Sequence, residues 1–118
     1  MKNHAETRIA SRLPDSLEWV NRFHKYKGNP ILRPQGNGYC ADAVFNPGAI
    51  VYQDRVGLLC RCINMTDPHD GDTWSVSTLG WAWSDDGVNF VMDEKPSFFP
   101  EAGSVYRGGF EDPRLVQV

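Results

Sequence analysis

The chain has 118 residues, and its 12 Lys and Arg against 15 Asp and Glu give a formal net charge of −3. This balance excludes a basic footprint for nucleic acid or an anionic membrane, so neither is expected as a partner. Hydrophobic residues make up 41% of the chain, which is typical of a soluble globular protein rather than a disordered one. Residues 1–10 are too polar for a signal peptide, and no run of about 20 apolar residues predicts a membrane span, so we expect a cytoplasmic location.

A helix is predicted over residues 14–26. Apolar residues recur there at three- and four-residue spacing, and Pro14 suits a first helical turn. The string Gly28-Asn29-Pro30 supplies a glycine cap and a proline that ends the helix. We therefore treat residues 1–28 as a helical extension that precedes the main domain at residues 29–118.

Two apolar segments follow. Residues 43–52 are interrupted by Pro47-Gly48, which predicts two short extended pieces with a bulge or bend between them. Residues 55–63 are continuously apolar, which is typical of a strand buried on both sides. Cys60 and Cys62 would share one face of that strand with Leu58, and Arg61 would lie on the other face.

The three cysteines are an odd number, which does not predict a disulfide framework, and Cys60-x-Cys62 lacks the second pair of ligands that a zinc site requires. Reduced thiols that fill space are expected, with no metal. The acidic loop at residues 67–72 is interpreted as solvated, since its spacing matches no calcium loop.

A hairpin is predicted next, with residues 74–84 and 88–92 paired across Asp85-Asp86-Gly87. Turns recur about every ten residues after residue 30, which favours an all-β sandwich, a barrel or part of a propeller. The chain stops on a new apolar run, so we expect a fragment with unpaired strand edges.

Three sets of residues could carry chemistry. Glu111-Asp112-Pro113-Arg114 could fix a carboxylic acid beside a cation, or could be a turn with a local salt bridge. Arg61 would need an anionic or hydroxylated partner on its apolar strand. Asn46 could bind a sugar hydroxyl, or could serve ordinary turn chemistry before Pro47. The tryptophans between residues 74 and 83 could stack on sugar rings, although such residues usually belong to a core.

The order of these strings resembles the opening of glycoside hydrolase family 130, which contains mannoside phosphorylases and related β-mannosidases. The resemblance runs from about residue 22 to the last residue. Its strings are Asn29-Pro30-Ile31-Leu32, Val44-Phe45-Asn46-Pro47-Gly48-Ala49, Leu58-Leu59-x-Arg61, Ser84-x-Asp86-Gly87-x-x-Phe90 and Gly109-Phe110-Glu111-Asp112-Pro113-Arg114.

The resemblance implies a five-bladed β-propeller that cleaves β-mannosides with inorganic phosphate, with inversion, to give mannose 1-phosphate. It assigns the acid to Asp112, with the proton relayed through a mannose hydroxyl, and places Asn46 and Arg61 in the mannose pocket. Inorganic phosphate is the co-substrate, no cofactor is implied, and a homo-oligomer is expected because family phosphorylases often form oligomers.

Five blades of about 50 residues each exceed this chain, which has room for about two. The residues that separate phosphorylases from hydrolases would lie beyond Val118. A β-mannosidase that uses water therefore stays open, as does a non-catalytic fragment that binds sugar or a partner chain, or a purely structural propeller module.

Overall fold

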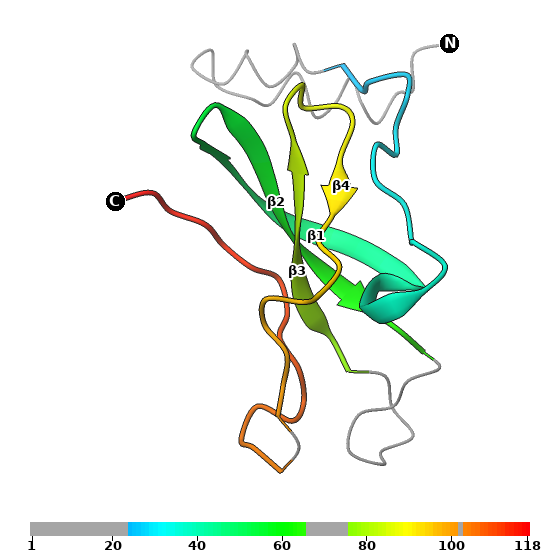
Figure 1. Ribbon diagram of the computed structural model, residues 1–118, viewed down its shortest axis with the longest axis vertical. Coiled ribbons are helices and arrows are strands. Elements are labelled where there is room, and N and C mark those ends of the chain that lie inside the picture. Colours follow the sequence, from blue (N-terminus) through cyan, green and yellow to red (C-terminus); the bar gives the residue numbers. More distant parts are fainter. Residues whose placement is uncertain (1–23, 66–75, 102) are drawn as a thin grey trace, which may run out of the picture.

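The computed structural model describes residues 24–65, 76–101 and 103–118 (Figure 1). A short 3-10 helix, η2 (Gly38–Cys40), precedes the strands β1 (Ala43–Tyr52), β2 (Arg55–Ile63), β3 (Thr78–Ser84) and β4 (Val91–Met92). The four strands form one antiparallel sheet in the order β1-β2-β3-β4. The predicted β-rich character is confirmed, with no α-helix in the described ranges. No helix in those same ranges is long and apolar enough to cross a membrane.

Most of the helix predicted over residues 14–26 lies outside the described residues, as does the acidic loop at residues 67–72. The end of the predicted helix is wrong, because residues 24–26 are not helical. A turn follows instead, in which the Asn29 backbone N–H donates to the carbonyl oxygen of Tyr26 at 3.1 Å. Pro30 disfavours a helical backbone at Asn29, which accounts for the turn at this position.

β1 is one bulged strand rather than the two pieces predicted. Its pairing with β2 shifts register between Phe45 and Gly48, where Asn46 adopts a φ of +46°. Pro47 has no N–H to donate to the ladder, so a bulge is the natural solution at that point. The ladder resumes at Gly48, which keeps the strand continuous.

β2 has the predicted limits, and its two faces alternate as expected. The core face carries Cys60 and Cys62, which pack with Cys40 and Ala82. All three cysteines are free and buried, which for Cys60 and Cys62 confirms the predicted space-filling role. Burial raises the pKa of Cys60 to about 11, so this thiol is chemically quiet.

The opposite face of β2 carries Leu59 and Arg61. The neighbouring Trp81 and Trp83 rings of β3 stack at a centroid distance of 4.9 Å, and both are half-buried. A side chain at Gly57 would meet both rings, so this glycine gives them room against β2. Trp81 and Trp83 pack on the sheet but lie outside the buried core cluster, so their interpretation as core residues is not confirmed, and Trp74 lies outside the described residues.

The predicted β3–β4 hairpin forms, although both strands are shorter than expected. Ala82 pairs with Met92 and Trp83 with Val91. Residues 88 and 89 do not join the ladder, because their backbone N–H groups donate to the Asp86 carboxylate at 2.9 and 2.8 Å. The side chain of the turn thus takes the donors that a longer β4 would have used.

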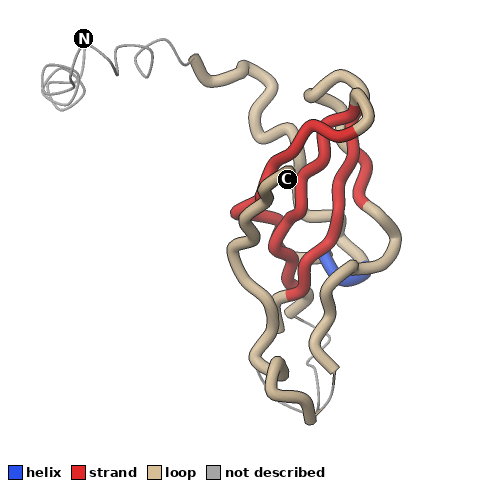
Figure 2. Tube along the Cα trace, turned by 90° about the vertical axis from the view of Figure 1, so that its left-hand side faces the viewer, coloured by secondary structure: helices blue, strands red, loops and turns tan. Residues whose placement is uncertain are grey.

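The C-terminal segment runs alongside the sheet (Figures 1 and 2). Gly109 forms a bridge with Ser77, and the Phe110 N–H donates to the Ser77 carbonyl oxygen at 2.9 Å. Further on, a Cβ at Gly48 would lie 2.9 Å from the Pro113 carbonyl oxygen. These two close approaches carry residues 110–113 across β2 and β1.

Candidate active site

The bulge of β1 presents Asn46 to the C-terminal segment. Its Nδ2 donates a hydrogen bond of 2.9 Å to Oδ1 of Asp112. Asp112 itself has a φ of +43°, a conformation that Asp and Asn tolerate better than most residues. Two residues with unusual backbones, 66 positions apart, therefore meet through their side chains.

Arg61 projects from the middle of β2 and is held on several sides. Its Nε donates to Oγ of the buried Ser77 at 2.8 Å, and its Cζ lies 4.8 Å from the centre of the Phe45 ring. Nη2 lies 2.6 Å from Oε1 of Glu111, and Nη1 lies 3.6 Å from Oδ1 of Asp112. The anionic partner that Arg61 was expected to need is thus supplied by two carboxylates.

Arg114 turns back on its own segment. Its Nη1 donates to the carbonyl oxygens of Asp112 and Pro113 at 3.1 and 3.2 Å. These hydrogen bonds stabilise the backbone of residues 112–113, and Arg114 does not form an ion pair with the Asp112 carboxylate. The alternative of a local salt bridge within the Glu-Asp-Pro-Arg string is therefore not what the structure has, because Glu111 forms its ion pair with Arg61 of β2.

The Asp112 carboxylate is stabilised as an anion. The hydrogen bond from Asn46 is the largest cause that lowers its pKa, and the charges of Arg61 and Arg114 act in the same direction. Partial burial opposes them. Asp112 is therefore ionised at neutral pH.

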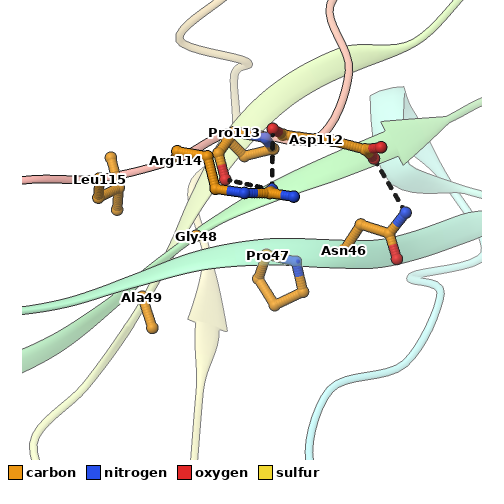
Figure 3. Close-up of a pocket in the computed structure, with 8 residues that line it drawn as sticks. All are labelled: Asn46, Pro47, Gly48, Ala49, Asp112, Pro113, Arg114 and Leu115. Atoms are coloured by element: carbon orange, nitrogen blue, oxygen red, sulfur yellow. Dashed lines mark hydrogen bonds between the residues drawn. The ribbon is translucent and has the colours of Figure 1, made fainter.

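A pocket of about 540 Å³ lies between the β1 bulge and the C-terminal segment (Figure 3). It is lined by Asn46, Pro47, Gly48, Ala49, Asp112, Pro113, Arg114 and Leu115. The Asn46 and Asp112 side chains meet at one end of it. The pocket thus offers an amide, a carboxylate and nearby guanidinium groups, which suit a polyhydroxylated or anionic ligand.

The structure brings together the three site residues that the sequence singled out, Asn46, Arg61 and Asp112. It adds Ser77 and a direct role for Glu111 in holding Arg61, neither of which was predicted. The glycine pair before Phe110 is the sequence signal that could have indicated a close backbone approach at this point. In the described part of the chain, no group of three His, Cys, Asp or Glu residues could hold a metal ion.

Comparisons with known proteins find two phosphorylases of β-1,2-linked mannose compounds. The chain is 34% identical over 98 residues to a 1,2-β-oligomannan phosphorylase of Thermoanaerobacter sp. (strain X514), covering 82% of this chain and 32% of the relative. It is 30% identical over 103 residues to a β-1,2-mannobiose phosphorylase of the same organism, covering 82% of this chain and 34% of the relative. The chain thus spans about a third of the length of both relatives. No family model matches.

A solved structure gives the same result at the level of the fold. It is described in terms of the GH130 family of mannoside phosphorylases and of glycoside hydrolases in it that target β-1,2 mannosidic linkages in Candida mannan. The identity is 30%, the TM-score is 0.60, and the match covers 78% of this chain and 30% of that structure.

Proposed function

Because the chain belongs to the GH130 family of mannoside phosphorylases, we propose that it is part of an enzyme that cleaves β-1,2-mannosides with inorganic phosphate. The products would be mannose 1-phosphate and a shortened mannoside. Both relatives are phosphorylases of β-1,2-linked mannose compounds, which supports this linkage. The four-stranded sheet would be one blade of a five-bladed propeller, and the segment after Gly109 would lead into the next blade.

The observation that carries the proposal is that Asp112 hydrogen-bonds to Asn46 at the pocket and lies 3.6 Å from Arg61, so that side chains from three separate segments come together. In this proposal Asp112 is the acid, and its proton reaches the leaving oxygen through a mannose hydroxyl. Asn46 and Arg61 would bind the mannose unit that is transferred. Phosphate is already an anion, so the attack would need no general base.

The lowered pKa of Asp112 has to rise before this residue can act as an acid. Phosphate drawn toward Arg61 would bring negative charge close to Asp112 and would compete for the same guanidinium. Both effects raise the pKa of a carboxyl group. Binding of phosphate would therefore favour the protonated form of Asp112 at the moment when a proton is required.

The proposal is tested with the natural polypeptide that contains these 118 residues. It is incubated with β-1,2-mannobiose, with and without inorganic phosphate, and the products are separated. Mannose 1-phosphate that forms only with phosphate is the expected result. No cleavage under either condition would contradict the proposal and would favour a sugar-binding role without turnover.

A second candidate is a β-mannosidase that uses water. The solved structure is described in terms of GH130 glycoside hydrolases that target β-1,2 mannosidic linkages. Its sequence identity to this chain is 30%, the same as that of the β-1,2-mannobiose phosphorylase. In the same experiment a hydrolase would release free mannose whether or not phosphate is present. The Asp112 acid would be common to both reactions.

A further inference from the structure

Glu111 lies next to the proposed acid in sequence, but it reaches the site through Arg61. Its Oε1 accepts a hydrogen bond of 2.6 Å from Nη2 of Arg61. This is at the short end for a charge-assisted hydrogen bond between a guanidinium and a carboxylate. The Glu111 side chain is 58% exposed and that of Arg61 is 18% exposed, so the bond lies at the edge of the sheet face.

The Arg61 guanidinium lies between the carboxylates of Glu111 and Asp112 and is closer to that of Glu111. The 3.6 Å from Nη1 to Oδ1 of Asp112 is too long for a good hydrogen bond, whereas the contact with Glu111 is short. The Nε bond to Ser77 and the Phe45 ring below fix the plane of the group. Because a guanidinium is planar and rigid, these anchors decide how near it can come to Asp112.

We propose that Glu111 is a positioning residue of this site, which rests on the proposed function: it holds Arg61 so that the guanidinium is shared and does not close onto Asp112. Without Glu111, Arg61 would have Asp112 as its one carboxylate partner. A closed Arg61–Asp112 pair would hold Asp112 more firmly as an anion and would occupy the guanidinium that the phosphate is to approach. Glu111 thereby keeps the acid capable of protonation.

The pKa of Asp112 is set by the charged and polar groups around it, so a change at Glu111 can be measured there. Asn46 comes from β1 and Arg61 from β2, while Glu111 and Arg114 flank it on its own segment. Glu111→Gln keeps the shape of an exposed side chain and removes its charge. We expect this variant to lower the pKa of Asp112 by about 0.5 pH unit, because Arg61 is released toward it and a like charge is lost. The pKa is read from the Asp112 carboxyl resonance in an NMR titration of the 118-residue chain.

A double-variant cycle separates the two causes. In an Arg61→Met background only the direct effect of the Glu111 charge remains, so Glu111→Gln should change the pKa of Asp112 by less than half as much. Glu101→Gln, another exposed glutamate of the C-terminal region, is the control and should leave it unchanged. An equal decrease in both backgrounds, or no decrease with Arg61 present, would overturn the proposal.

A second readout at pH 7 requires no acidification. With one anchor of Arg61 removed, its Nε–H should exchange with solvent about fivefold faster in Glu111→Gln, as expected for the loss of one exposed charge-assisted bond. An unchanged exchange rate would mean that Glu111 does not hold Arg61 and would also overturn the proposal. Neither measurement needs turnover, so a failure here is distinct from a failure of the proposed function.

Discussion

Asn46 and Asp112 both have a positive φ, and they hydrogen-bond to each other. Non-glycine residues in this region are strained by about 1–3 kcal/mol each and persist where the surroundings fix them. Here the β1 bulge fixes Asn46, while the bridge of Gly109 to Ser77 and the passage of residue 113 over Gly48 fix Asp112. The position of Asp112, the proposed acid, therefore depends on two glycines, Gly109 and Gly48, that allow the C-terminal segment to lie close to the sheet.

Gly109→Ala tests this dependence. A Cβ at Gly109 would lie 2.6 Å from the Ser77 carbonyl oxygen, at a φ of +97°. Both the backbone strain and the contact with backbone atoms oppose the change, so we expect a loss of at least about 2 kcal/mol in the free energy of unfolding. Urea unfolding of the chain measures it.

Gly36→Ala is the matched control for that variant. Gly36 has a φ of +75°, but a Cβ there would meet nothing within 4 Å. It should cost about 1 kcal/mol from strain alone. Equal losses in the two variants would mean that the close approach to Ser77 contributes nothing.

The residues that the sequence predicted for the site are those with an unusual local context. Arg61 interrupts an apolar strand, Asn46 precedes a proline, and Asp112 lies in a charged string. Ser77 was missed, because its contact with Arg61 depends on how residues 76–79 come alongside β2, which no local pattern encodes. The pairing of Glu111 with Arg61 was missed for the same reason.

At the scale of elements, β2 was predicted to its exact limits, since a continuous apolar run bounded by turns has few alternatives. The prediction of two separate pieces for β1 is wrong, because Pro47 indicates an interruption of the strand but does not show whether the pairing continues after it. β4 was predicted too long, since Asp86 competes for backbone donors. Side-chain contacts to the backbone thus account for the error at the hairpin.

The hairpin turn should make stability depend on pH. Hydrogen bonds from the backbone of Asn89 and Val88, from the Asn89 side chain and from Ser84 lower the pKa of Asp86 well below its ordinary value of 3.8. A carboxyl group with a lowered pKa in the folded state contributes stability above its ordinary pKa and loses it as the pH falls toward the folded value. Urea midpoints at pH 6 and pH 3 should therefore differ less in Asp86→Asn than in the parent chain.

Glu94→Gln serves as the control for the hairpin, because Glu94 is another exposed carboxylate close to β4. Its pH dependence should match that of the parent. If Asp86→Asn and the parent lose stability equally between pH 6 and pH 3, the Asp86 hydrogen bonds do not stabilise the folded state.

At the scale of the whole molecule, the sheet has one face packed around thiols and one face that carries the site. The core face gathers Cys40, Cys60 and Cys62 with Ala82, while the other face carries Arg61 and the C-terminal segment. The family was predicted from ordered strings of residues and the β-rich class from the spacing of turns after residue 30, and both are confirmed.

The thiols report on the packing of the whole sheet. All three are buried, and burial raises the pKa of each, that of Cys60 to about 11. Since the thiolate is the reactive form, iodoacetamide at pH 8 should modify Cys60 in the folded chain about 100-fold more slowly than in urea. Peptide mass spectrometry of the modified chain measures the rates. Rapid labelling of Cys60 under native conditions would contradict the described core.

The most direct test of the central claim, that Asp112 is the acid of a mannoside-cleaving site, is turnover by Asp112→Asn. In the natural polypeptide that contains this chain, the amide keeps the hydrogen bond partner of Asn46 but cannot supply a proton. We predict that cleavage of β-1,2-mannobiose in phosphate buffer falls by at least about 100-fold, while calorimetric binding of the disaccharide is nearly unchanged. Activity within a few-fold of the parent would contradict the account and would remove Asp112 as the acid.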